Sequence, residues 1–415
     1  MKKRQKQDPQ QLDSREELLP GELPPLGCAG RREKGKRAGK APKAVYRIIA
    51  VLLVCVVALA VWINRENLQP QNLVEWVQTQ VVGLGVGDGY PASLSGDTVA
   101  PANFHSVDKD LYLTGDTSIL CMNDSAKVLF SRKHSYADPV MRVKGNRVLV
   151  YGRGASGYRV ENQIKTLVSG DAQGKILVGD VAANGRYALV TEAGGYCGKL
   201  TAYLNNNTVA YHYWFSDYYP TAIALNAQGT KAAVAAVGAH NGGLVSAVYV
   251  LDFNSSAAVK PVATYPDTYL RDIAFDGTGI LALGDVQAVA LKADGTPLGS
   301  CDYKSGGLQA WQMDGNSAVL AVGSPNNASG MTLLHLDANA KTTASVSLAG
   351  KVTGVSLFGD AMAALQGEQV QAYSASTGAA LGKADAGPDA CAVALRTESE
   401  AYLLGVSEVR KVSLS

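Results

Sequence analysis

The sequence predicts an all-β fold, an eight-bladed β-propeller with seven blades as the alternative, preceded by an N-terminal transmembrane helix and a short juxtamembrane helix. Three observations carry this prediction. The 415 residues include 44 glycines and only 18% charged residues; because about a quarter is usual, turns are favoured over long charged helices. A unit of strands and tight turns recurs roughly every 40 residues from Val99 onward. An unbroken apolar stretch precedes these repeats.

The first 44 residues form a basic tail that contains prolines and few apolar residues. Such a composition buries too little surface to offset the entropy lost on ordering, so residues 1–44 are predicted to be disordered. Through Arg47 the chain has 13 basic and 6 acidic residues, a charge of +7. Because the whole chain carries only +2, the remainder carries −5. A mildly acidic body argues against a nucleic-acid partner, which requires a basic surface.

Residues 45–63 read VYRIIAVLLVCVVALAVWI, with Arg47 as the single charge. A helix of this length spans about 28 Å, close to the ~30 Å thickness of the hydrocarbon core. A cleavable signal peptide is the competing interpretation, but its apolar region has only about 7–15 residues and precedes a small-residue cleavage site. The sequence therefore predicts a single-pass anchor in the cell membrane. Basic flanks stay inside, so the N-terminus is expected to be cytoplasmic and the body extracytoplasmic.

Residues 64–89 are predicted to connect the anchor to the body. Apolar residues at helical spacing within 71–82 indicate a short amphipathic helix beside the membrane, with Trp76 near the headgroups. The alternating glycines between Gly83 and Gly89 disfavour a helix and permit unusual backbone angles. Residues 90–415 are the predicted propeller ectodomain.

Eight tight polar turns mark the repeats of the body. Each precedes a short apolar run such as LYLTG, RVLVYG or KAAVAAVG, whose length and turn-rich flanks indicate a strand. Eight such units without a helical interruption are typical of a β-propeller. The turns are Asp108-Lys109, Gly145-Asn146, Asn184-Gly185, Gln228-Gly229, Asp276-Gly277, Asp314-Gly315, Gly359-Asp360 and Glu398-Ser399.

The eighth unit is one strand short. Its strands are predicted at Cys391–Leu395, Ala401–Gly405 and Val409–Leu414, with no fourth strand after them. A missing outer strand would leave a row of open hydrogen-bonding groups along the edge of this blade. Residues 90–99 precede the first complete unit, and we expect them to supply the closing strand of the ring.

The chain also resembles known propellers. The turns Ala293-Asp294-Gly295 and Ser376-Thr377-Gly378 resemble those of PQQ-like repeats. The anchor, Trp76, the segment Gly87–Pro91 and Asn103-Phe104 together resemble an uncharacterised family of single-pass bacterial envelope proteins, domain of unknown function 5711. The resemblance covers nearly everything after residue 44. It implies a PQQ-like or WD40-like propeller on a membrane anchor, and it implies no activity.

No catalytic or cofactor motif accounts for the body. Residues 152–157, GRGASG, match G-x-G-x-x-G, but a dinucleotide site needs a helix after the last glycine, and YRVE predicts a strand instead. A quinoprotein dehydrogenase would need regular tryptophans between blades, whereas the body has only Trp214 and Trp311. The histidines are scattered and no CxxC occurs, so we expect no metal and no cofactor. Unpaired thiols are expected, with two disulfides as the alternative, at Cys121, Cys197, Cys301 and Cys391.

Aromatic residues concentrate in residues 211–220, YHYWFSDYYP. The alternating aromatics Tyr211, Tyr213 and Phe215 are predicted to pack between blades, whereas the pair after them lies in a connection from one blade to the next. Such connections share one face of a propeller with the hairpins between second and third strands. Amphipathic aromatics there suit protein or glycan recognition, and ordinary loop polarity is the competing interpretation. The predicted binding residues are Tyr136, Asp217, Tyr218, Tyr219, His240 and Tyr269.

The sequence thus predicts a non-enzymatic binding or assembly scaffold of the bacterial cell envelope, with a protein or glycan partner. The alternative is an enzyme, a hydrolase or lyase built from loop residues at the mouth of the propeller. If the protein is an enzyme, we expect a pair of carboxylates or histidines with shifted pKa values in the central funnel. If it is a scaffold, we expect no such pair.

Overall fold

The computed structural model describes residues 51–56, 85–94, 96–303, 306–324 and 330–415. The chain divides into two units, Met1–Asn64 and Arg65–Ser415. In the first unit, the described residues 51–56 are helical with exposed side chains. The expected tail, the rest of the expected membrane span and the expected juxtamembrane helix lie outside the described residues. Among the residues that are described, no helix has both the length and the apolar character needed to cross a bilayer.

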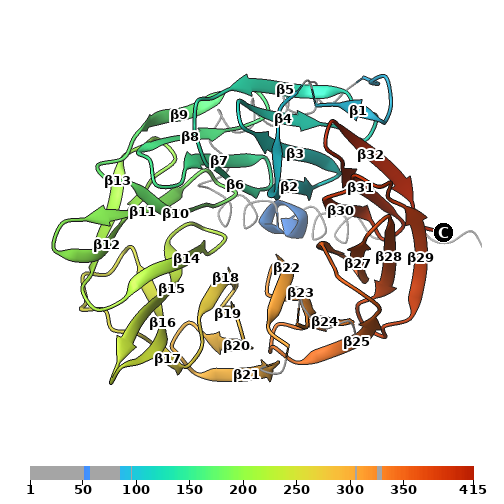
Figure 1. The fold of residues 1–415 in the computed structure, drawn as a ribbon. Coiled ribbons are helices and arrows are strands. Elements are labelled where there is room, and N and C mark those ends of the chain that lie inside the picture. The colour runs from blue at the N-terminus through green and yellow to red at the C-terminus, as the bar shows by residue number, and fades with distance from the viewer. Residues whose placement is uncertain (1–50, 57–84, 95, 304–305, 325–329) are drawn as a thin grey trace, which may run out of the picture. The chain divides into compact units, whose positions relative to one another are not determined.

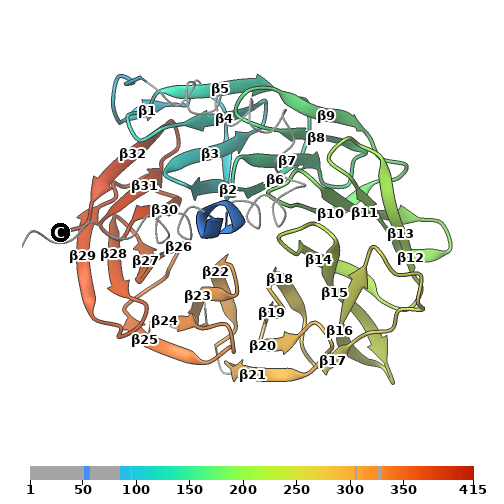
Figure 2. The ribbon, with the colours of Figure 1, turned by 180° about the vertical axis from the view of Figure 1, so that it is seen from behind.

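The second unit is a β-propeller of eight four-stranded antiparallel sheets arranged around a ring (Figure 1). The view from behind shows the same eight blades (Figure 2). The prediction of eight blades is confirmed, and the seven-bladed alternative is wrong. The innermost strands of blades 1 to 8 are β2 (Val99–Val107), β6 (Pro139–Lys144), β10 (Ile176–Val181), β14 (Tyr219–Leu225), β18 (Leu270–Asp276), β22 (Leu308–Asp314), β26 (Gly354–Phe358) and β30 (Ala392–Thr397).

Each following strand lies one place further from the centre of the ring. The second strands are β3 (Asp110–Gly115), β7 (Arg147–Gly152), β11 (Tyr187–Ala193), β15 (Lys231–His240), β19 (Gly279–Gly284), β23 (Ser317–Val322), β27 (Ala361–Gln366) and β31 (Glu400–Leu404). The third strands are β4 (Ser118–Met122), β8 (Gly157–Glu161), β12 (Tyr196–Tyr203), β16 (Gly243–Asp252), β20 (Gln287–Lys292), β24 (Met331–Leu336), β28 (Gln369–Ser374) and β32 (Glu408–Ser413). The outermost strands are β5 (Val128–Lys133), β9 (Thr166–Asp171), β13 (Val209–Phe215), β17 (Ala263–Pro266), β21 (Pro297–Asp302), β25 (Thr342–Leu348), β29 (Ala380–Asp385) and, for blade 8, β1 (Ala92–Ser93).

The ring closes through the N-terminal strand β1. Ala92 pairs with Val409 and Ser93 with Glu408 of β32, so β1 is the outermost strand of blade 8. This is the place expected for residues 90–99. Of those that the structure describes, Ala92 and Ser93 pair with β32, whereas Val99 belongs to β2 and pairs with Gly115 of β3. The glycines before β1 allow the chain to lie close to blade 1. The Gly87 N–H donates to Ser125 Oγ (2.9 Å), and a Cβ at Gly87 would lie 2.3 Å from the Lys127 backbone nitrogen.

The core consists of eight apolar clusters, and each cluster joins two adjacent blades. The second strands are buried on both faces, which explains their continuous apolar runs in place of alternation. In β15 the run from Ala232 to Ala236 is fully buried. Small side chains there let neighbouring sheets approach closely, so the alanines are a packing requirement of the ring.

Polar side chains on the innermost strands link neighbouring blades. In four blade pairs, such a side chain accepts a hydrogen bond from a backbone N–H on the innermost strand of the next blade, at 2.8–3.0 Å. These hydrogen bonds satisfy backbone N–H groups of the innermost strands, which form the inner edge of each sheet and would otherwise be unpaired there. The acceptor and donor pairs are Asn103 with Met141, Asp180 with Leu225, Gln312 with Leu357, and Ser356 with Leu395.

Two predictions about individual motifs are confirmed. Residues 152–157 connect β7 to β8 as a hairpin, so no helix follows the glycines as a dinucleotide site would need. The thiols of the body are unpaired and lie in four different blades. They are Cys121, Cys197, Cys301 and Cys391.

Candidate functional site

The connections between blades and the hairpins between second and third strands lie at one end of the ring, which we call the connection face. In blade 4, the N–H of Asp267 in the β17–β18 connection donates to the carbonyl of Leu244 beside the β15–β16 hairpin (2.9 Å). In blade 2, the N–H of Arg153 in the β7–β8 hairpin donates to the carbonyl of Asp138 in the β5–β6 connection (2.8 Å). The topology expected from the sequence therefore places all six predicted binding residues on this face.

Three of these residues lie at the edge of blade 4. Tyr219 begins β14 and pairs with Val237 of β15, three residues before His240. At about 3.4 Å per residue, Tyr219 and His240 are roughly 10 Å apart along the sheet. The Tyr219 side chain is 61% exposed, and Asp217 and His240 are exposed as well. These side chains are therefore available to a partner.

Tyr218 has a packing role that the sequence analysis did not assign to it. Its side chain is half-buried and packs against the cluster between blades 3 and 4. The ring meets that of Tyr249 edge-on, with centroids 6.3 Å apart. A Cβ at Gly238 would lie 2.8 Å from Tyr218 Cδ1, so the glycine makes room for the ring. Tyr218 supports the connection that carries Tyr219.

Tyr269 lies one blade further along, in the β17–β18 connection, and is 36% exposed. Its N–H donates to Asp285 Oδ1 (2.9 Å), which holds the connection against blade 5. The same connection contacts the β15–β16 hairpin through Asp267. Tyr269 is thus the next exposed aromatic along the rim after Tyr219.

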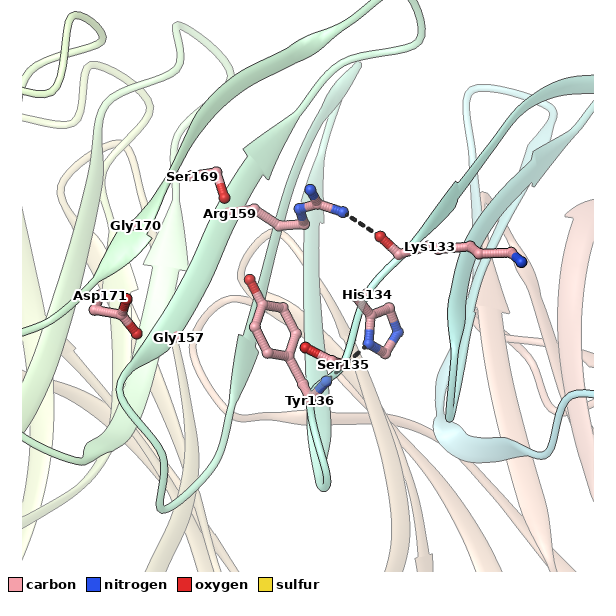
Figure 3. Close-up of a pocket in the computed structure, with 9 residues that line it drawn as sticks. All are labelled: Lys133, His134, Ser135, Tyr136, Gly157, Arg159, Ser169, Gly170 and Asp171. Carbon is pink, nitrogen blue, oxygen red and sulfur yellow. Dashed lines mark hydrogen bonds between the residues drawn. The ribbon is translucent and has the colours of Figure 1, made fainter.

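Tyr136 lies elsewhere, at the boundary of blades 1 and 2. It lines an open pocket of about 460 Å³, together with residues 133–135, the start of β8 and the end of β9 (Figure 3). Its ring stacks on that of His134, with centroids 5.2 Å apart, and its N–H donates to His134 Nδ1 (3.2 Å). The structure therefore separates Tyr136 from the other five predicted residues.

Blade 3 carries exposed aromatics that the sequence analysis missed. Tyr211, Tyr213 and Phe215 of β13 pack toward blade 4, as predicted. The alternate residue Trp214 points the other way and is 43% exposed, and Tyr196 is 51% exposed with its ring 6.4 Å from Trp214. The alternation of β13 contained this signal, because residues next to interblade packers lie on the opposite face of the strand. We call Tyr196, Trp214, Tyr219 and Tyr269 the aromatic rim.

Titratable side chains also gather on the innermost strands of the ring. His105 of β2 interacts electrostatically with Arg142 of β6 and with Asp272 of β18. Burial, helped by the charge of Arg142, lowers the pKa of His105 to about 4. Burial raises the pKa of Asp180, against the opposing effect of Lys144. These are shifted groups of the kind that the enzyme alternative predicts for the funnel.

The carboxylates of this group already have structural partners. Asp180 Oδ2 accepts the Leu225 N–H (2.8 Å). Asp272 Oδ2 accepts the Trp311 Nε1–H (2.9 Å), and its Oδ1 accepts the Ile273 N–H (2.9 Å). Over the described part of the chain, no group of three or more His, Cys, Asp or Glu residues is placed to hold a metal ion.

Solved structures similar to this chain are β-propellers. The C-terminal WD40 domain of Sif2 aligns at a TM-score of 0.55 and 10% identity, over 79% of this chain and 99% of that one. BamB from Moraxella catarrhalis aligns at a TM-score of 0.51 and 10% identity, over 80% of this chain and 100% of that one. Chaetomium thermophilum Sqt1, bound to the N-terminus of the ribosomal protein L10, aligns at a TM-score of 0.50 and 13% identity, over 78% of this chain and 100% of that one. At such identities the similarity concerns the fold alone.

No curated protein matches the sequence. Residues 92–407 match a family of unknown function, and the matched region begins at the closing strand β1 and ends just before β32, the third strand of blade 8. This is the family that the sequence resembled. The chain belongs to the DUF5711 family of unknown function.

Proposed function

We propose that this chain is a membrane-anchored scaffold of the bacterial cell envelope that binds a protein partner through the aromatic rim. The observation that carries the proposal is the exposure of four large aromatic side chains on one face, at 36–61%. Most aromatic side chains of the blades are buried or half-buried between sheets. Exposed tyrosine and tryptophan provide large contact areas with little conformational entropy to lose, and they are enriched at protein interfaces.

The partner is proposed to be a protein because the rim combines aromatic and polar groups over several blades. Lys199 lies 5.2 Å above the Trp214 ring, and exposed Asp217 and His240 flank Tyr219. Apolar anchors with a polar border are the usual anatomy of a protein interface. Sqt1, a propeller of similar fold, is bound to the N-terminus of another protein, which illustrates that the fold can receive a polypeptide.

The proposed location depends on the sequence of the first 63 residues. The apolar stretch 45–63 and its +7 flank support an anchor with the propeller outside the cytoplasm. Protease added to intact protoplasts should digest the propeller and spare an N-terminal tag. Loss of the N-terminal tag with protection of the propeller would overturn this orientation.

The binding proposal is tested by substituting two members of the rim, Trp214→Ser and Tyr219→Ser, in the full chain. Partners are then captured from detergent-solubilised membranes. Each change should weaken binding by about 30-fold, the equivalent of roughly 2 kcal/mol, without lowering the melting temperature. Phe358→Ser is the matched control, because Phe358 is 37% exposed at the opposite end of the ring, beside the β26–β27 turn. Equal capture by all variants would refute the proposal.

The enzyme alternative retains one favourable observation, the shifted pKa values of His105 and Asp180 on the innermost strands. Against it, both Asp180 and Asp272 are engaged in structural hydrogen bonds. A general acid or base must reach its substrate within about 3 Å. Hydrolysis of ester or glycoside substrates by the full chain, lost in Asp272→Asn, would favour the enzyme over the scaffold.

A further inference from the structure

A buried ion triad joins blades 1 and 2 and fixes one wall of the pocket that contains Tyr136. Glu161 of β8 is fully buried. Its Oε2 lies 3.0 Å from Arg132 Nη1 of blade 1, and its Oε1 lies 3.1 Å from Arg159 Nε of its own strand. Arg159 also donates from Nη1 to the carbonyl of Lys133 (2.8 Å). The Arg159 side chain is therefore held in place as part of the wall, and Glu161 balances its charge.

The floor of the pocket is a four-residue patch of β8 and β9. Gly157 pairs with Asp171, and Arg159 pairs with Ser169. Paired residues, and residues two apart along a strand, lie on the same face of a sheet. A Cβ at Gly157 would lie 2.7 Å from Tyr136 Cε1. The Tyr136 ring therefore lies over Gly157, next to the position of Asp171.

Three oxygen-bearing side chains share the space between the floor and the Tyr136 ring. In Figure 3 the Tyr136 hydroxyl, the Ser169 hydroxyl and the Asp171 carboxylate are directed toward one another. Neither hydroxyl makes a hydrogen bond to any residue that the structure describes. The Asp171 carboxylate accepts one hydrogen bond, from the Ser156 hydroxyl (2.9 Å), and keeps its remaining acceptor capacity. Burial raises the pKa of Tyr136, so its hydroxyl stays protonated and can donate.

The charges around the pocket cancel. The triad carries +1, because two arginines share one carboxylate, and Asp171 carries −1. Figure 3 shows the Lys133 ammonium pointing away from the pocket. His134 is neutral at neutral pH, because burial lowers its pKa below the usual value. The pocket therefore offers hydrogen-bonding groups without an excess of either charge, which favours a neutral polar ligand.

We propose that this pocket binds the ring of a neutral saccharide. Ser169 and Asp171 are two residues apart on β9, about 7 Å, so a ligand that bonds to both and to Tyr136 must carry polar groups on several sides. A sugar ring does, and its hydroxyls can donate to a carboxylate and accept from hydroxyls. The volume of about 460 Å³ falls within the range of small-molecule sites, roughly 300–1,000 Å³. This site is independent of the aromatic rim and of its proposed protein partner.

The test measures binding to the full chain by isothermal titration calorimetry, in a detergent without a sugar headgroup. The probes are the neutral sugars glucose, galactose, mannose and N-acetylglucosamine, with glucosamine and glucuronate as charged counterparts. At least one neutral sugar should bind about 10-fold more tightly than either charged one, because an ammonium cannot accept a hydrogen bond and a carboxylate cannot donate one to Asp171. A charged sugar that binds as tightly as the best neutral one would overturn the proposal. So would the absence of binding by every neutral sugar at millimolar concentrations.

Two substitutions connect the binding to the pocket. Asp171→Asn should weaken binding of the neutral sugar about 10-fold or more, and Ser169→Ala about 2- to 10-fold, since bonds to a charged acceptor are the stronger ones. Both residues are exposed, so the melting temperature should be unchanged. Asp385→Asn is the matched control and should bind as the wild type does, since Asp385 ends β29 of blade 7 as Asp171 ends β9 of blade 2. Unchanged binding in both pocket variants would overturn the proposal.

Discussion

The interface between blades 1 and 2 and the interface between blades 3 and 4 occupy equivalent places in the ring but are built from different side chains. The first buries seven apolar residues, and the second buries fourteen. The first adds the triad of Glu161 and the amide of Gln163, which donates to Asp110 (2.8 Å) and to the Tyr112 hydroxyl (2.9 Å). The second adds ring contacts, with Phe215 5.3 Å from Tyr249.

This difference shows how one fold supports two kinds of surface. Charge-assisted hydrogen bonds fix the orientation of blades 1 and 2 but require buried charges to remain paired. Those charges reach the connection face as a polar pocket. Blades 3 and 4 are stabilised by apolar burial, and the aromatic residues that do not fit between them lie exposed on the rim. The first interface adjoins an open polar pocket, and the second leaves exposed the aromatic side chains through which we propose that a protein binds.

The largest expected effect is in the apolar interface. Phe215 is fully buried, so Phe215→Ala should lower the free energy of unfolding by about 3–5 kcal/mol through lost burial and the remaining cavity. Denaturation by urea at low and high salt measures the loss, which should be nearly the same at both. A loss below about 1 kcal/mol would show that blades 3 and 4 do not depend on this ring.

The polar interface should respond to the removal of one charge. Glu161→Gln leaves two arginines without their carboxylate, and breaking a buried pair costs about 3–5 kcal/mol. Because the Arg132 and Arg159 side chains remain 18% and 17% exposed, we expect a smaller loss, about 2–3 kcal/mol. Adding Arg132→Met should recover part of it. Unchanged stability in Glu161→Gln would contradict the role assigned to the triad.

The two adjacent tyrosines should separate packing from recognition. Tyr218 packs on Gly238 and Tyr249. Tyr218→Ala should therefore destabilise the propeller by about 1–2 kcal/mol, less than the truncation of a fully buried aromatic ring would. Tyr219 is exposed, and Tyr219→Ala should change stability by less than about 0.5 kcal/mol. Melting temperatures of the two variants decide this. Equal values would place both residues in the same environment.

Acid should destabilise the propeller through His105 of blade 1. The pKa of His105 in the folded chain is about 4, so between pH 6.5 and 4 the unfolded chain binds a proton that the folded chain does not. This contribution to stability is present above pH 6.5 and is lost as the pH falls through that range. From pH 7.5 to 5.5, the wild type should lose about 1 kcal/mol more than His105→Asn. Parallel stability curves for the two proteins would refute this assignment.

The blade count could be predicted from the sequence because each unit repeats the same turn chemistry. Closure could also be predicted, since three strands were expected in the eighth unit and residues 90–99 precede the first complete unit; β1 does pair with β32. The alternation of Tyr211, Tyr213 and Phe215 identified the residues between blades. These features are local, or they follow from counting strands.

The remaining features depend on which neighbouring blade each side chain meets. Inner strands such as β15 are buried on both faces over most of their length, whereas the outermost strand β13 alternates between half-buried and exposed residues. Tyr218 lies after β13, where this alternation ends, so its packing was not recognised. The exposure of Trp214 was contained in the alternation but was missed. Arg132 and Glu161 are 29 residues apart and belong to different blades, so no local pattern reveals their contact.

Photo-cross-linking from the aromatic rim in intact cells tests the central claim most directly. A photoreactive phenylalanine analogue would replace Tyr219 in one protein and Phe358 in the other, since both side chains are exposed but lie at opposite ends of the ring. The account predicts a discrete cross-linked species from position 219, lost when Trp214→Ser is added, and no such species from position 358. The same adducts from both positions, or adducts from position 358 alone, would contradict it.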